Sequence, residues 1–142
     1  MNEQTTFDDS PRTGVALLLS WQGRLLVGRR IKPPQEGHWQ LPGGWIRHGE
    51  TPQQAIGRQI AAFGAIQCEE PRFVGFSNNL FDDGLHSISL YFEVTCTAPP
   101  PAGDALKQNT ACRDWQWARW NALPQPLFLP LQRLTESGFT LS

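Results

Sequence analysis

The feature that most constrains the fold is a helix with clear start and stop signals over Thr51–Gly64, in the segment TPQQAIGRQIAAFG. Thr51 is typical of an N-cap, and Pro52 suits the first helical position. Gln54 stands three residues after the cap and completes a capping box. Gly64 can adopt the left-handed conformation that ends a helix. The sequence therefore predicts a helix with both ends defined by local chemistry.

One apolar stripe runs along this helix, because Ile56, Ile60 and Phe63 recur at spacings of four and three residues. Such a stripe needs a sheet or another helix to pack against. Five segments have the composition or alternation of β-strands, namely Thr13–Ser20, Arg24–Arg30, Arg72–Asn78, His86–Val94 and Asp114–Trp120. The first two flank a glycine turn and predict a hairpin.

A second helix is predicted near the C-terminus, where apolar residues recur at helical spacing (Leu127, Phe128, Leu131 and Leu134). Pro130 should delay the start of this helix or kink it, and Gly138 should end it. Between the last two strands, the proline-rich segment Thr97–Cys112 predicts a long surface loop. Strands on both sides of an internal helix, followed by a second helix, indicate the α+β class.

Composition narrows the range of partners. The formal net charge is −1 and 18% of the residues are charged, so no global field favours nucleic acid or an anionic membrane. No apolar run approaches the roughly 20 residues that span a bilayer. Three cysteines without a paired spacing indicate free thiols and a reducing, cytoplasmic location. We expect one domain over residues 1–142, with residues 1–12 as a flexible tail; a homodimer is compatible with the sequence.

The segment Gly37–Ile66, GHWQLPGGWIRHGETPQQAIGRQIAAFGAI, resembles the signature of the Nudix hydrolases. Five residues match that pattern at its spacing: Gly44, Glu50, Arg58, Ile60 and Ile66. The resemblance implies an α/β/α sandwich with a mixed central sheet, a Nudix-box loop-helix-loop and a C-terminal helix. It also implies a phosphohydrolase-type protein that recognises a nucleoside diphosphate linked to another moiety, such as a nucleotide sugar or a nucleoside triphosphate.

The helix departs from the Nudix pattern where the family carries metal-binding glutamates. Gln59, Ala62 and Phe63 stand at those positions. Magnesium takes oxygen ligands in a near-octahedral shell and usually needs carboxylates to hold it. At most, the backbone carbonyl of Gly43 or Gly44 and the Glu50 carboxylate could hold Mg2+ or Mn2+, weakly or only together with a nucleotide.

The resemblance further implies that Glu50 pairs with Arg58 and braces the loop against the helix. A general base would then have to lie outside the helix, and the candidates are Glu50, Asp82, Asp83, Asp104 and His86. Other interpretations remain open. The sequence FDDG at Phe81–Gly84 is also typical of a plain acidic turn, and His86 is equally compatible with a core or pocket wall.

Candidate substrate-binding residues precede the helix: Arg29, Arg30, Trp39, Gly43 and Gly44. The segment Gly28–Gly44 is similar to the GDP-mannose mannosyl hydrolase branch of the family, and Arg113–Phe139 is similar to the nucleoside triphosphate diphosphatase branch. The two arginines could clamp phosphate, or one of them could form a surface salt bridge. Trp39 could stack on a base or pack in the interior.

Two function classes follow from these observations. In the first, the chain is a Nudix-type enzyme with a reduced metal site and weak or absent metal-dependent hydrolysis. In the second, it is a catalytically inactive module on the same fold that binds a nucleotide or another partner. Metal dependence of nucleotide binding distinguishes the two classes, because only the first uses the metal to bind or cleave its substrate.

Overall fold

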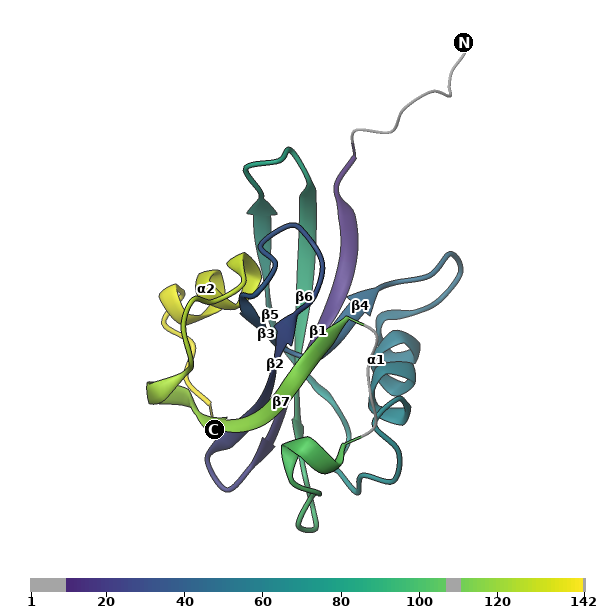
Figure 1. Cartoon of the computed structure of the whole chain (residues 1–142). Helices are drawn as coiled ribbons and strands as arrows, with labels where there is room; N and C mark the ends of the chain where they lie inside the picture. The colour runs from purple at the N-terminus through teal and green to yellow at the C-terminus, as the bar shows by residue number, and fades with distance from the viewer. Residues whose placement is uncertain (1–9, 107–110, 142) are drawn as a thin grey trace.

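A β-sheet with a helix on each face forms the centre of the protein (Figure 1). The structure is a computed structural model and describes residues 10–106 and 111–141. Its strands are β1 (Arg12–Trp21), β2 (Arg24–Arg30), β3 (Trp39–Gln40), β4 (Gly43–Trp45), β5 (Arg72–Leu80), β6 (His86–Thr95) and β7 (Cys112–Arg119). Its α-helices are α1 (Pro52–Ala61) and α2 (Leu129–Glu136). The predicted α+β class is confirmed.

The sheet is mixed. Its main order is β3-β2-β1-β6-β5, while β4 pairs with β1 and β7 pairs with β2. β1 runs parallel to β6 over nine residue pairs, from Arg12 opposite Ser87 to Ser20 opposite Thr95, and antiparallel to β2 and β4. The predicted hairpin between β1 and β2 is present, although β1 begins at Arg12, inside the segment expected to be a flexible tail.

The two helices pack on opposite faces of the sheet, as β1 demonstrates. Successive side chains of a strand point to opposite faces. Leu17 and Leu19 share one buried cluster with Ile56 of α1, whereas Leu18 shares a second cluster with Leu131 of α2. The helices therefore form the outer layers, and β1 supplies both cores.

The predicted signals at the ends of α1 are confirmed. The Thr51 hydroxyl accepts from the Gln54 N–H at 3.1 Å, and the Gln54 side chain accepts from the Thr51 N–H at 2.9 Å. Gly64 has a positive φ of 90°. Ile56 and Phe63 are buried, so the predicted apolar stripe faces the core.

The second helix begins at Leu129, with Pro130 in its first turn, as the sequence predicted. Gln35 fixes its start from outside, since its side-chain oxygen accepts from the Leu129 N–H at 2.7 Å. Tyr91 of β6 donates its hydroxyl to the Pro130 carbonyl at 2.7 Å. These two contacts hold the N-terminus of α2 above the sheet and create one wall of the cavity described below.

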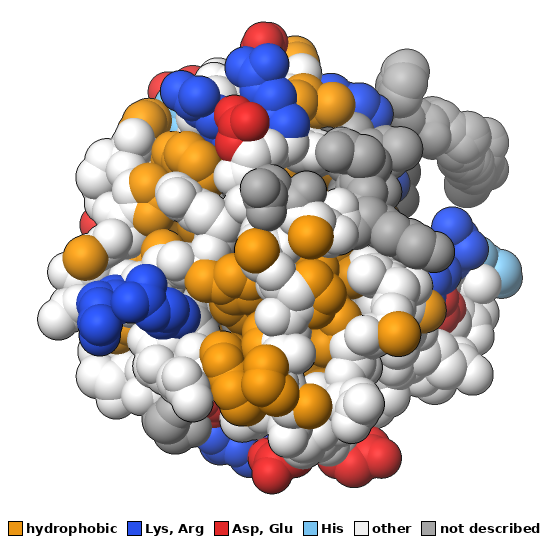
Figure 2. Space-filling model, turned by 60° about the horizontal axis from the view of Figure 1, so that its bottom comes forward, with side chains coloured by type: hydrophobic (Ala, Val, Ile, Leu, Met, Phe, Trp, Pro, Cys, Tyr) orange, Lys and Arg blue, Asp and Glu red, His pale blue; other side chains and the backbone are white. Residues whose placement is uncertain are grey.

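The surface carries charges of both signs. On the face in Figure 2, hydrophobic side chains gather near the centre, and both basic and acidic side chains lie toward the edge. This distribution agrees with the net charge of −1. None of the described helices is both long and apolar enough to cross a membrane.

Candidate functional site

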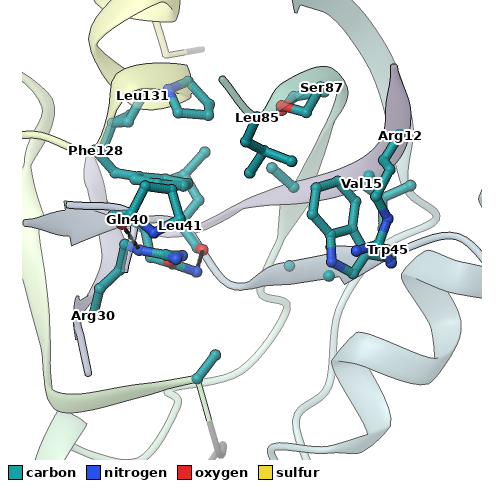
Figure 3. Close-up of a pocket in the computed structure, with 18 of the residues that line it drawn as sticks. Arg12, Val15, Arg30, Gln40, Leu41, Trp45, Leu85, Ser87, Phe128 and Leu131 are labelled. Carbon is teal, nitrogen blue, oxygen red and sulfur yellow. Dashed lines mark hydrogen bonds between the residues drawn. The ribbon is translucent and has the colours of Figure 1, made fainter. Parts of the chain in front are cut away.

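A cavity of about 450 Å3 lies between the sheet and the N-terminal turn of α2 (Figure 3). Strands β1, β4 and β6 contribute to its lining, and so do Pro33 and Pro34, which follow β2. Its aromatic lining comprises Trp45, Phe81, Tyr91 and Phe128. The cavity volume falls in the range of small-molecule sites, which are largely apolar with a few placed polar groups.

The charged residues that line the cavity are all basic. They are Arg12, Arg30 and Lys32, and no Asp or Glu occurs among the described lining residues. The guanidinium of Arg12 lies 4.0 Å from the centre of the Trp45 ring. Within the described part of the chain, none of the three basic residues forms an ion pair. The cavity therefore has a positive potential and favours an anionic ligand.

Arg30 is fixed in place by several contacts. Its Nη1 donates to Gln40 Oε1 at 2.6 Å, and its Nε donates to the Pro34 carbonyl at 2.9 Å. The guanidinium also stacks 4.0 Å from the centre of the Phe128 ring. Burial lowers the pKa of Arg30, although an arginine remains protonated at neutral pH. Arg30 thus presents a fixed positive charge at the cavity wall.

A hydrogen-bond network lies behind the polar side of the cavity, which Ser87, Ser89 and Tyr91 line. The fully buried Asn79 donates to the hydroxyls of Ser87 and Ser89, each at 3.1 Å. Ser77 Oγ lies 2.6 Å from the Tyr91 hydroxyl and donates to Asn79 Oδ1 at 2.8 Å. Burial raises the pKa of Tyr91 to about 12, so this side chain stays protonated. Its role is to join the sheet to α2.

Glu50 and Arg58 form a bidentate pair beside the cavity. Arg58 Nε donates to Glu50 Oε2 at 2.9 Å, and Arg58 Nη2 donates to Glu50 Oε1 at 2.9 Å. Arg58 Nη2 also donates to the Trp45 carbonyl at 3.1 Å. Hydrogen bonds from Arg58 and from the Arg47 N–H lower the pKa of Glu50 to about 2. Through these hydrogen bonds, the Glu50 carboxylate connects α1 to the loop that follows β4.

This pair predicts an acid-dependent stability difference. Because the folded-state pKa of Glu50 is lowered, the stabilisation is complete above the unfolded value of 4.5 and is lost as the pH falls toward about 2. Arg58→Ala should melt below the parent at pH 7, and the gap should narrow between about pH 4.5 and pH 2. Thermal unfolding of both proteins across that range measures the gap.

The exposed Arg24 provides a matched control. Arg24→Ala removes an arginine without touching Glu50, so its melting temperature should follow that of the parent at every pH. A gap for Arg58→Ala that stays constant down to pH 2 would show that Glu50 does not titrate through this contact.

The three helix positions that the Nudix pattern assigns to glutamates have different environments. Gln59 is buried, and a Cβ atom placed on Gly44 would lie 2.6 Å from its Nε2. Ala62 is exposed at the end of α1. Phe63 is 3% exposed and packs edge-on against Trp115, with 5.1 Å between ring centres. Only one of the three side chains thus faces solvent.

The residues present do not fit a divalent metal. Among the described residues, no three His, Cys, Asp or Glu side chains are grouped to hold a metal ion. Glu50 is already occupied by Arg58, and neither Gln59 nor the side chain at position 62 supplies a carboxylate. Nudix hydrolases generally use Mg2+ or Mn2+, but the described residues around α1 offer those ions too few charged oxygen ligands.

The structure places the predicted substrate residues in two groups. Arg30, Gly43 and Gly44 line the cavity. Arg29 does not line it and instead lies 3.6 Å from Asp114 on the surface. Trp39 also lies outside the cavity lining and packs with the core beneath α2.

The candidate bases are not gathered around the cavity. Asp83 accepts from the Leu85 N–H at 3.0 Å and stabilises a turn, while Asp82 is exposed beside it. His86 Nε2 lies 2.6 Å from Asn78 Oδ1. The Asp104 side chain lies outside the described part of the structure. None of the first three lines the cavity, although their neighbours Phe81, Leu85 and Ser87 do.

Several cavity residues did not emerge from the sequence, among them Arg12, Trp45, Ser87, Ser89 and Tyr91. For Ser87, Ser89 and Tyr91, the alternation pattern of β6 contained a sequence signal. The sequence HSISLYFEV alternates, and the set opposite to the apolar one consists of Ser87, Ser89, Tyr91 and Glu93. A buried strand with polar residues on one face often lines a binding site.

Comparison with known proteins agrees with this architecture. Residues 10–136 match the NUDIX domain family. A MutT NUDIX hydrolase from Burkholderia pseudomallei superimposes with a TM-score of 0.77 at 23% identity, covering 92% of this chain and 99% of that chain. The NUDIX domain of Shewanella oneidensis NrtR, solved with ADP ribose, has a TM-score of 0.64 at 20% identity, covering 89% of this chain and 85% of that chain.

An RNA pyrophosphohydrolase from Hydrogenovibrio crunogenus is 28% identical over 88 residues, which are 61% of this chain and 51% of the relative. The match thus spans about half the length of that curated protein. The family match extends from the start of the described region to the end of α2 and includes both helices and all the strands named above. This chain belongs to the NUDIX family.

Proposed function

We propose that this protein recognises a nucleoside diphosphate linked to another moiety, and that its metal-dependent hydrolysis is weak or absent. The observation that carries the proposal is the cavity. It combines three basic residues that form no ion pair within residues 10–106 and 111–141 with aromatic walls, and none of its described lining residues is a carboxylate. The anionic diphosphate would lie near Arg30 and Lys32. The aromatic side chains would contact the base or the sugar.

The side chains of α1 and of the two residues that follow it support the second half of the proposal. Gln59 and Phe63 are buried, and Ala62 has no ligand atom, so the helix provides no carboxylate cluster for Mg2+. A diphosphate held by arginine and lysine needs no metal to bind. In the alternative, the chain is an inactive binding module on the Nudix fold. This alternative follows from the same absence of carboxylates on α1 and differs from a weak enzyme only in having no residual turnover.

Calorimetry with ADP-ribose tests the proposal, with a nucleotide sugar and a nucleoside triphosphate as further probes. ADP-ribose is the first choice because a structural neighbour was solved with it. We expect binding in the presence of a chelator, with an affinity that changes less than about twofold when millimolar Mg2+ is added, since the cavity charge is already positive.

Product analysis of the same mixtures provides the second measurement. We expect turnover far below roughly 1 s−1, the lower end of ordinary enzyme rates. Metal-dependent hydrolysis at ordinary rates would show that residues outside α1 hold the metal and catalyse the reaction, and would overturn the proposal. Residual slow turnover would favour a weak enzyme, and none would favour the binding module.

A further inference from the structure

Cys68 and Cys96 lie directly opposite each other, although 27 residues separate them in the sequence. Cys68 belongs to the segment between α1 and β5, and Cys96 directly follows β6. The two residues form an isolated antiparallel bridge. Two backbone hydrogen bonds flank the pair, from Glu69 N–H to Thr95 O at 2.8 Å and from Thr97 N–H to Gln67 O at 2.9 Å.

This pattern defines the kind of pairing. Since the hydrogen bonds connect the residues on either side, Cys68 and Cys96 form a non-hydrogen-bonded pair, in which Cα atoms are about 4.5 Å apart and the side chains are closest. Disulfides span Cα separations of about 4.4–6.8 Å. The backbone therefore already holds the two thiols at a separation that a disulfide can bridge.

The two thiols differ in access. Cys68 is half-buried, whereas Cys96 is 4% exposed within the core cluster beneath α1. Burial raises the pKa of both thiols, that of Cys96 to about 11, so both resist oxidation at neutral pH more than an exposed thiol does. An oxidant in solution can reach Cys68 first, and Cys96 can then act only on the sulfur of Cys68.

We propose that Cys68 and Cys96 are a modification site. A small-molecule disulfide such as oxidised glutathione oxidises the two thiols, and an intramolecular disulfide forms between them. The Cys68 thiolate attacks one sulfur of oxidised glutathione and releases one glutathione thiolate. The Cys96 thiolate then attacks Cys68 Sγ and releases the second. Two protein thiols lose two electrons and two protons, and one oxidised glutathione becomes two reduced molecules.

The cross-link joins the segment after α1 to the end of β6. It closes a loop that contains all of β5 and β6 and the turn between them. A disulfide across a loop of this length restricts the unfolded chain, so oxidation should raise the melting temperature by roughly 10 °C. The third cysteine, Cys112, is opposite Arg30 in the β2–β7 pairing and provides an internal control.

The test incubates the folded full-length protein with oxidised glutathione at mildly alkaline pH, alkylates the remaining thiols and maps the peptides by mass spectrometry. We expect a peptide pair linked through Cys68 and Cys96, alkylated Cys112, and a higher melting temperature that dithiothreitol reverses. Cys112→Ala should behave like the parent, while Cys68→Ser and Cys96→Ser should lose the temperature shift.

Each other result counts against the proposal. A stable glutathione adduct on Cys68 without an internal bond would show that Cys96 cannot reach it, and covalent dimers through Cys68 would show an intermolecular reaction instead. Complete alkylation of all three cysteines would show that the pair does not oxidise. The parent peptide map alone decides among these outcomes, so a variant that fails to fold does not obscure the result.

Discussion

Phe63→Ala should lower the free energy of unfolding by about 3–5 kcal/mol, the usual range for truncating a buried phenylalanine. The Phe63 side chain is 3% exposed, and its ring packs edge-on against Trp115 with 5.1 Å between centres. The truncation removes this aromatic contact and leaves a cavity between α1 and the sheet. Urea unfolding monitored by tryptophan fluorescence and circular dichroism measures the loss.

The neighbouring Ala62 supplies the control. It is exposed at the end of α1, so Ala62→Glu should cost less than about 1 kcal/mol, mainly through the unfavourable interaction of a carboxylate with the helix C-terminus. Equal costs at the two positions would contradict the placement of Phe63 in the core.

The contrast between these positions shows how the end of α1 accommodates residues other than glutamate. A glutamate at position 63 would have to bury its charge against Trp115, which is costly without a partner. At position 62 a glutamate would meet only solvent. Phe63 directly follows the C-cap of α1 and packs in the core, at a position where the Nudix resemblance places a glutamate.

Structural features that depend on residues close together in the sequence could be predicted from the sequence. The capping box of Thr51 and Gln54 and the turn at Gly64 involve residues within one or two helical turns, and the structure contains each of them. The β1–β2 hairpin has the same local origin, with positive φ at Gln22 and Gly23. Such elements depend on backbone preferences that the sequence displays directly.

The cavity could not be predicted because its walls meet only through non-local pairing. Arg12 reaches Trp45 because β1 pairs with β4, and Tyr91 reaches Pro130 because α2 docks on β6. No spacing along the chain encodes these contacts. The same holds for Cys68 and Cys96. They are far apart in the sequence, and only the folded chain places them opposite each other.

Strand geometry restricts the prediction that Arg29 and Arg30 both bind phosphate. Arg29 and Arg30 are consecutive residues of β2, so their side chains leave opposite faces of the sheet. Arg30 accordingly lines the cavity, and Arg29 lies near Asp114 on the surface. Two adjacent strand residues cannot both clamp one phosphate from the same face, whatever their chemistry.

Leu85→Glu should weaken the binding of ADP-ribose at least about tenfold relative to Leu85→Gln, provided that the diphosphate occupies the cavity. Leu85 lines the cavity, and Figure 3 shows its side chain directed into it. The added carboxylate would compensate the positive charge of Arg12, Arg30 and Lys32 and would repel an anionic ligand. Calorimetry of both variants in chelator measures the difference without any contribution from metal.

The glutamine variant isolates the charge, because glutamine and glutamate have nearly the same size and shape. Both variants keep the hydrogen bond from the Leu85 N–H to Asp83 Oδ1, so the turn before β6 should persist and their melting temperatures should agree. Equal affinities of two equally stable variants would place the anionic group of the ligand away from Leu85. A large loss confined to Leu85→Glu would instead support binding through the positive potential of the cavity, since the two side chains differ only in charge.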